Sequence, residues 1–238
     1  MERAAVRRRL DQLVSRFRQL RRRIAGEPAL RETVRKLEAF QSGRLAATYR
    51  DLLQDARFRP AVEFFLSDLY GPQDLSARDD QVLRALDKLK RFLPSAALDA
   101  LARAFELQVM SLELDAQTAG LLPAGRDIDA GSYAAAYRAA GQATERERQI
   151  SLIGEIGRLL DMLASRRDVG LALRLAHGPA HAAGYGDLQD FLERGYRAFR
   201  QMEGAGPFLT TIAHRERLLM QQLFAGCDEL EVGTPTLG

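Results

Sequence analysis

The stretch MERAAVRRRLDQLVSRFRQLRRRI, residues 1–24, decides the fold class of this chain. Its apolar residues recur at alternating steps of four and three, which is the spacing of a helix that packs one face against another helix. Nine arginines and only two acidic residues make its other faces strongly basic. We therefore predict an amphipathic first helix, which docks through an apolar seam of Val6, Leu10, Leu13, Phe17, Leu20 and Ile24.

Helical periodicity continues along the rest of the chain. Apolar residues recur at three and four, and the alternating runs of valine, isoleucine or threonine that indicate strands do not occur. The sequence also has no internal repeat of fixed period. It thus predicts an all-α fold, built as a single multi-helix bundle of about nine or ten helices.

The turn signals predict how this bundle is organised. Gly26 and Pro28 end the first helix, and a long second helix that reaches Leu52 is expected to fold back on it as a hairpin. We expect residues 1–55 to form this basic hairpin and to pack on a helical core at residues 56–226 as part of one domain. Residues 227–238 are expected to form a flexible tail.

Composition restricts the class of protein. With 238 residues, 46 % of them hydrophobic, the chain can bury a sizeable core. Its apolar runs are far shorter than the roughly 20 residues that span a bilayer, so no transmembrane segment is expected. The basic N-terminus lacks the apolar stretch of a signal peptide. The single cysteine, Cys227, excludes a disulfide within the chain and suits a reducing compartment, so we expect a cytoplasmic protein.

The most unusual local stretch is FRPAVEFFLSDLYGPQDLSARDD, residues 58–80. Pro60 suits the first turn of a helix that is expected to end near Tyr70. Because apolar side chains fall on both sides of this helix, we expect it to lie centrally and to leave Glu63 or Asp68 partly desolvated. Such a carboxylate is either paired with an arginine or serves a ligand.

Glu216 is another acidic residue within an apolar pattern. It follows Ile212 by four positions and precedes Leu219 by three, so it points inward from the last helix. It either pairs with an arginine of an adjoining helix or acts as a ligand or general base. Arg215 lies off this stripe and is expected at the surface or at the rim of a groove. A ligand pocket would bring together Glu63, Asp68, Tyr70, Glu216 and an arginine such as Arg44 or Arg215.

Motifs for metal or covalent chemistry are weak or missing. His177 and His181 stand four apart, as two metal ligands on one helix face would, but Gly178 and Pro179 between them are expected to break the helix. The sequence contains no Glu-x-x-His pair, no Gly-x-Ser-x-Gly and no phosphate-binding glycine loop. We therefore expect no metal or cofactor, and His177 and His181 are only weak metal candidates.

Two segments carry a resemblance to a known family. FFLSDLYGPQD at residues 64–74, preceded by RPA, and IAHRERLLMQQLF at residues 212–224 resemble a family of uncharacterised bacterial all-helical proteins. The resemblance covers most of the chain and implies a cytosolic helical domain. It implies no particular activity, cofactor or catalytic residue, so it assigns no role to any position.

Three functional hypotheses follow from these patterns. The first is a non-enzymatic protein that works through protein contacts, including a homodimer joined through the first helical hairpin. The second is a bundle, enzymatic or not, that binds a ligand or metal through buried carboxylates. The third is binding of nucleic acid or an acidic surface through Arg7, Arg8, Arg22 and Arg23. The absence of a catalytic constellation favours the first hypothesis.

Overall fold

The structure, a computed structural model, describes residues 3–69, 81–86, 90–91, 95–123 and 125–227, with the backbone alone at residues 68 and 69. All regular structure in these ranges is helical, and eleven helical elements are defined there. The all-α bundle predicted from the sequence is confirmed, and the number of helices is close to the nine or ten expected.

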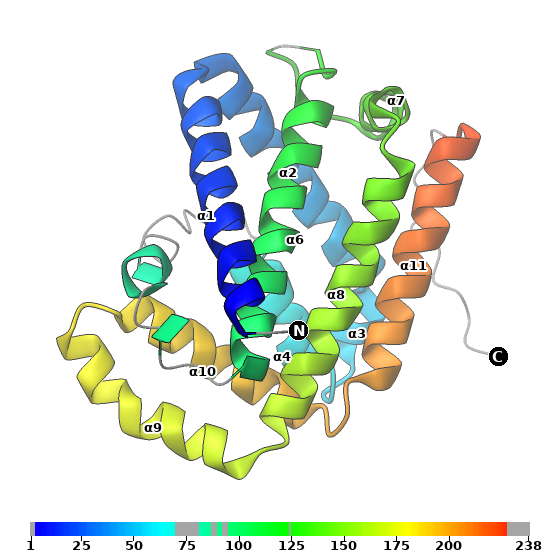
Figure 1. The fold of residues 1–238 in the computed structure, drawn as a ribbon. Coiled ribbons are helices and arrows are strands. Elements are labelled where there is room, and N and C mark those ends of the chain that lie inside the picture. The colour runs from blue at the N-terminus through cyan, green and yellow to red at the C-terminus, as the bar shows by residue number, and fades with distance from the viewer. Residues whose placement is uncertain (1–2, 70–80, 87–89, 92–94, 124, 228–238) are drawn as a thin grey trace.

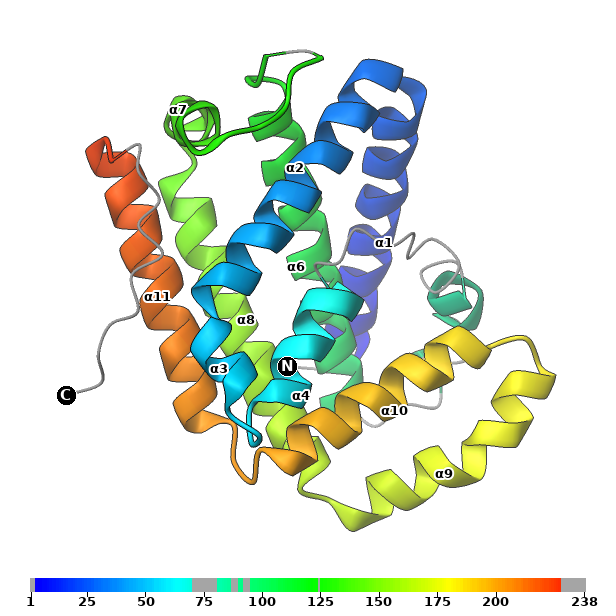
Figure 2. The same cartoon turned by 180° about the vertical axis from the view of Figure 1, so that it is seen from behind.

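Figures 1 and 2 show the bundle from opposite sides, with α9 and α10 forming a hairpin at one end. The elements, in chain order, are α1 (Arg3–Gly26), α2 (Pro28–Thr48), α3 (Arg50–Gln54), α4 (Arg59–Phe64), the π-helix η1 (Phe65–Leu69), α6 (Ser95–Ala119), α7 (Ala130–Ala140), α8 (Ala143–Ala164), α9 (Arg167–Ala182), α10 (Gly186–Gln201) and α11 (Gly206–Ala225).

The apolar seam of α1 packs mainly along α6 of the same chain. Phe17 contacts Phe105 edge-on, with ring centroids 5.9 Å apart. Arg16 Nε donates to Glu113 Oε1 at 2.6 Å beside this apolar contact. Five predicted seam positions are buried, whereas Leu13 is half-buried and Val14 takes the central place. The sequence thus predicted the face of α1 that docks, and the structure identifies α6 as its main partner.

The central helices pack closely because small residues lie at their contacts. On α8, Gly157 faces Leu209 of α11 so closely that a Cβ at position 157 would overlap the leucine side chain. Phe199, Met202 and Phe208 are buried in the same cluster as Tyr49 and Phe64. Several members of this cluster, including Tyr49 and Phe208, also line a cavity in the bundle.

Two predicted helix boundaries differ from the structure. The second helix, expected to reach Leu52, ends at Thr48, and the separate helix α3 follows from Arg50. The helix that begins near Pro60 continues as the π-helix η1 to Leu69, close to the expected end, and Tyr70 lies outside the described residues. The break expected at Gly178 and Pro179 is absent, because α9 continues through Pro179 to Ala182. Proline at this position removes a hydrogen bond to the carbonyl of residue 175, which is near the helix end and accessible to water, so the helix tolerates it.

A long connection joins α6 to α7. α6 ends at Ala119, and α7 begins at Ala130, where Asp129 and Ser132 form a reciprocal capping box. The tail beyond Cys227 lies outside the described residues. Among the helices that are described, none combines the length and apolar character needed to cross a membrane.

Candidate functional site

A cavity of about 100 Å³ lies in the middle of the bundle. One wall is apolar and includes Phe65, Ile153 and Phe208. Polar and charged side chains, termed the polar wall, make up much of the remaining lining, which is unusual for the centre of a helical bundle and typical of a ligand pocket. Its polar lining comes from five helices and the residue after α2, and comprises Gln41, Arg44, Tyr49, Asp115, Tyr133, Tyr137, Arg146, Gln149 and Glu216.

Glu216 points inward from α11, as its spacing predicted, and pairs with Arg44 of α2. The two Nη atoms of Arg44 each donate to one carboxylate oxygen of Glu216 at 3.0 Å, and the Tyr49 hydroxyl donates to Oε1 at 2.7 Å. Burial alone would raise the pKa of Glu216, but the charge and hydrogen bonds of Arg44, with that of Tyr49, hold it below its ordinary value. Glu216 is therefore ionised, and its ion pair with Arg44 explains how this carboxylate can be buried.

Arg44 keeps one donor without an acceptor. Its Nε is buried, and no group among the described residues accepts a hydrogen bond from it. Buried polar atoms in proteins are almost always satisfied, so an unpaired donor on the cavity wall indicates a place where another polar molecule can bind.

Arg146 of α8 is the second buried guanidinium of the cavity, with only 7 % of its surface exposed. Its Nη2 donates to Thr118 Oγ1 at 3.0 Å, and its Nη1 lies 3.4 Å from Gln149 Oε1. Its Cζ also lies 4.7 Å from the centre of the Tyr137 ring, a cation–π contact. In the part of the chain that the structure describes, no carboxylate lies within ion-pair distance of Arg146.

Two carboxyl groups, Asp115 of the cavity lining and its neighbour Glu38, have raised pKa values. Asp115 of α6 accepts a hydrogen bond from Gln41 Nε2 at 3.0 Å. Burial raises the pKa of Asp115, although the charge of Arg146 opposes the increase. Burial, assisted by the negative charge of Asp115, raises the pKa of Glu38 on α2 to about 7. The Glu38 carboxyl, which does not line the cavity, can therefore exchange a proton near neutral pH.

The polar wall can hold an anion next to an apolar group. Glu216 neutralises Arg44, whereas Arg146 faces only neutral acceptors, an aromatic ring and a carboxyl group with a raised pKa. A ligand carboxylate could accept charge-assisted hydrogen bonds from Arg146, while its apolar body lies against Phe65 and Ile153.

The structure brings together only part of the predicted pocket. Arg44 and Glu216 both line the cavity and pair with each other, which is the structural alternative to a ligand role for Glu216. Glu63 is exposed on α4, so it is not the buried carboxylate that the apolar pattern suggested. The side chain of Asp68 and the whole of Tyr70 lie outside the described residues.

Arg215 is buried, which overturns the expectation that it lies at the surface or rim. Its Nη1 and Nη2 donate to the two carboxylate oxygens of Asp51 at 2.7 and 2.6 Å, and Nη1 also donates to the Thr48 carbonyl at 2.8 Å. The burial of Arg215 is explained by these contacts, because its charge is paired with Asp51 of α3 and it also bonds the last residue of α2. Arg215 therefore supports the helix packing beside the cavity and is not part of its lining.

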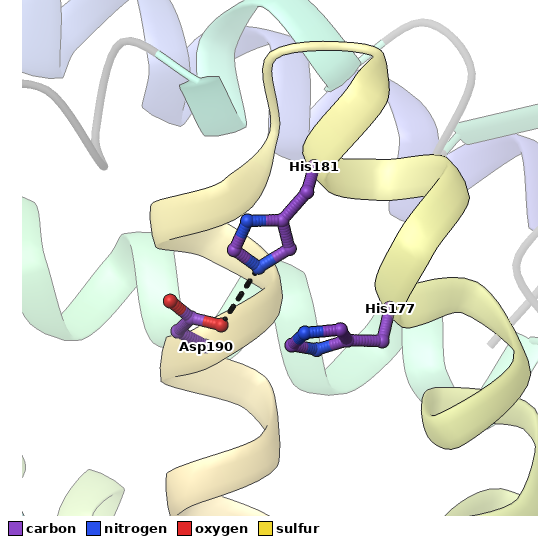
Figure 3. A group of neighbouring side chains, drawn as sticks. All are labelled: His177, His181 and Asp190. Atoms are coloured by element: carbon purple, nitrogen blue, oxygen red, sulfur yellow. Dashed lines mark hydrogen bonds and ion pairs between the residues drawn. The ribbon is translucent and has the colours of Figure 1, made fainter.

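His177 and His181 lie on one exposed face of α9, because the predicted break between them does not occur. Their rings are 4.5 Å apart, and Figure 3 shows both next to Asp190 of α10. His181 Nε2 lies 2.9 Å from Asp190 Oδ1, and His177 Nδ1 lies 2.9 Å from Glu193 Oε1.

The basic candidates on α1 have different surroundings. Arg7 donates from Nε and Nη2 to the Lys90 carbonyl at 3.1 and 2.7 Å, so it holds the neighbouring segment against α1. Arg8, Arg22 and Arg23 are exposed, and Arg23 lies 3.4 Å from Glu27. Contact of these exposed arginines with nucleic acid stays a prediction, which a salt titration of binding would test.

Of the nine residues of the polar wall, the sequence pattern identified only Arg44 and Glu216 and missed the other seven. Gln41, Asp115, Tyr133 and Tyr137 belong to helices whose patterns are explained by packing alone. Arg146 had a detectable signal, since it precedes Ile150 by four positions on the apolar stripe of α8. That is the same kind of spacing that identified Glu216 on α11.

Comparison with known proteins gives the chain a family. No curated protein and no solved structure matches it. Residues 20–230, which include every residue that lines the cavity, match the family described as Domain of unknown function (DUF8198), and the chain belongs to this family.

Proposed function

We propose that this protein binds a small molecule in the central cavity, and that the ligand carries one carboxylate or similar anion on an apolar body. The observation that supports this most strongly is Arg146, which lines the cavity with 7 % exposure and no carboxylate partner among the described residues. A buried charge without a counterion is costly, and a bound anion would offset that cost.

The remaining features of the cavity limit the ligand. Arginine has five N–H donors, and Arg146 uses only two of them in hydrogen bonds to described residues. The cavity volume of about 100 Å³ is somewhat smaller than the roughly 150 Å³ cavity that accepts benzene in another protein. The ligand is therefore a small acid whose apolar body is smaller than a benzene ring, such as a short-chain carboxylate. Among the described residues that line the cavity there is no serine, threonine, cysteine or lysine to act as a nucleophile, so we infer binding without catalysis.

Calorimetry with butyrate as the probe tests this function. Butyrate should bind with one site per chain, and uncharged 1-butanol should bind much more weakly. Arg146→Gln should abolish butyrate binding, whereas Arg158→Gln, which removes an exposed arginine from the same helix, should leave it unchanged. Equal affinities of the two variants, or no binding of butyrate and other short-chain carboxylates, would refute the proposal.

Protein contact is the second candidate function, and the exposed leucines of α9 favour it. Leu171 is 53 % exposed and Leu175 is 70 % exposed, and α9 has no buried residue. The seam of α1 is covered by α6, so we assign self-association to α9 at the edge of the bundle (Figure 1). Two copies related by a two-fold axis would cover the same leucines on each other.

Light scattering tests the α9 contact. A dimer that becomes a monomer when Leu171 and Leu175 are both changed to serine supports it. Leu121→Ser, which changes a leucine of 50 % exposure in the loop before α7, is the matched control and should leave the mass unchanged. A monomeric unmodified protein, or a dimer that persists in the double variant, would exclude this contact.

A further inference from the structure

Three side chains that could hold a metal ion lie together on the outer face of the α9–α10 hairpin. His177 and His181 come from α9, and Asp190 comes from α10. One ring nitrogen of each histidine and one carboxylate oxygen of Asp190 lie within 4.8 Å of one another. Figure 3 shows the two rings and the carboxylate turned toward a common point between the helices.

Local backbone features create this arrangement. α9 stays helical through Pro179, so residues 177 and 181 share one face of the helix. Gly184, with φ of +78°, reverses the chain and places α10 beside α9. Gly186 has no side chain where a Cβ would lie only 2.8 Å from His181 Nδ1. The hairpin thus leaves space for the His181 ring next to Asp190.

We propose that His177, His181 and Asp190 form a site for a divalent cation, and that the site binds Zn²⁺. Two imidazole nitrogens and one carboxylate oxygen are the donor types that zinc prefers, and a fourth position would remain open to water. Tetrahedral zinc with bonds near 2.0–2.1 Å requires ligand atoms about 3.3 Å apart. The exposed histidines can reach that separation by small side-chain rotations from their present positions.

Glu193 supplies the outer contact that such a site needs. Its Oε1 lies 2.9 Å from His177 Nδ1 and 2.9 Å from Gln189 Nε2. A hydrogen bond at Nδ1 fixes the imidazole tautomer that leaves Nε2 available for the metal. Glu193 is therefore a positioning residue, whereas the other three side chains are ligands.

Metal binding would tie α9 to α10. Because α9 contributes no buried residue, it is held largely by its contacts with α10 and α8. A ligand that binds only the folded hairpin stabilises it in proportion to the logarithm of the metal concentration. The site thus gives the protein a way to rigidify its exposed helix when zinc is present.

Calorimetric titration of the full chain with zinc chloride tests the site directly. A Cys227→Ser background removes the exposed thiol, which is another zinc ligand. We expect one zinc ion per chain, loss of saturable binding in His177→Ala and in His181→Ala, and affinity weakened by about 10–100-fold in Glu193→Gln. His214→Ala removes the third histidine, which is exposed on α11 and outside the cluster, and should bind zinc like the parent.

A spectroscopic readout separates a built site from general surface binding. Co²⁺ bound by His177, His181 and Asp190 should show visible absorption that Zn²⁺ displaces and that Asp190→Asn alters. Circular dichroism confirms that each variant is folded. The proposal is overturned if zinc does not saturate below about 1 mM, or if the variant lacking both His177 and His181 binds it as tightly as the parent.

Discussion

The α1–α6 contact and the central cavity use arginine in opposite ways. Along α1, apolar side chains fill the interface, and Arg16 pairs with Glu113 at the exposed edge. In the cavity, Arg44 and Arg146 are themselves buried, and one is balanced by Glu216 whereas the other has no carboxylate partner in the described chain. Burial of charge, and not abundance of arginine, therefore marks the part of the molecule that helix packing leaves unexplained.

The two regions should also differ in energetic character. An exposed ion pair contributes about 0–1 kcal/mol and weakens with salt, whereas removing one partner of a buried pair costs about 3–5 kcal/mol. The α1–α6 contact should therefore respond to changes in apolar volume, and the cavity wall should respond to changes in charge.

The largest effect is expected for Phe17→Ala in the α1–α6 contact. Phe17 is 2 % exposed and packs on Phe105, so truncation should leave a cavity and lower the free energy of unfolding by about 3–5 kcal/mol. Urea denaturation followed by circular dichroism measures this change. A loss below about 1 kcal/mol would show that α1 is not stabilised by its seam.

A loss of about 3 kcal/mol is expected for Glu216→Gln in the cavity wall, because Arg44 then remains buried without a counterion. Restoring neutrality with Arg44→Met in the same chain should recover part of the loss. Urea denaturation of the single and double variants gives the coupling free energy. Strict additivity would contradict the assigned ion pair.

Glu38→Gln should stabilise the protein by about 2 kcal/mol at pH 8 and leave it unchanged near pH 4. Folding raises the pKa of Glu38 from its ordinary 4.5 to about 7, so the folded state favours the protonated carboxyl. Its contribution is fully present below pH 4.5 and is lost as the pH rises through about 7. Glutamine stays neutral and avoids that loss.

Unfolding measured from pH 4 to pH 8 tests this expectation for Glu38. Glu63→Gln, a change at an exposed carboxyl group on α4, should follow the parent protein at every pH. Parallel pH curves for Glu38→Gln and the parent would show that the Glu38 carboxyl is not desolvated by folding.

The smallest effect is expected for Glu113→Ala, which removes the exposed ion pair with Arg16. The free energy of unfolding should fall by less than about 1 kcal/mol, and the difference should shrink further at high salt. Urea denaturation at two salt concentrations measures it. A large loss of unfolding free energy that does not change with salt would show that the ion pair at the edge of the α1–α6 contact behaves like the buried pair of the cavity.

Periodicity predicted some of the candidate site and missed the rest for a definite reason. Within one helix, spacing determines which residues share a face, so the inward direction of Glu216 was predictable. The burial of Arg215 was not, because it depends on Asp51, which lies 164 residues away in the chain. The approach of Asp190 to His181 was hidden in the same way, since it requires the turn between two helices.

The helical character of this chain and the apolar face of α1 can be predicted from its amino acids, because both follow from contacts within three or four residues. Long-range packing was needed to show that α6 covers this face, that Arg146 and Asp115 line one cavity, and that two histidines lie next to a carboxylate. Those pairings join helices distant in the chain, and their charges acquire unusual energies only after packing removes the water around them.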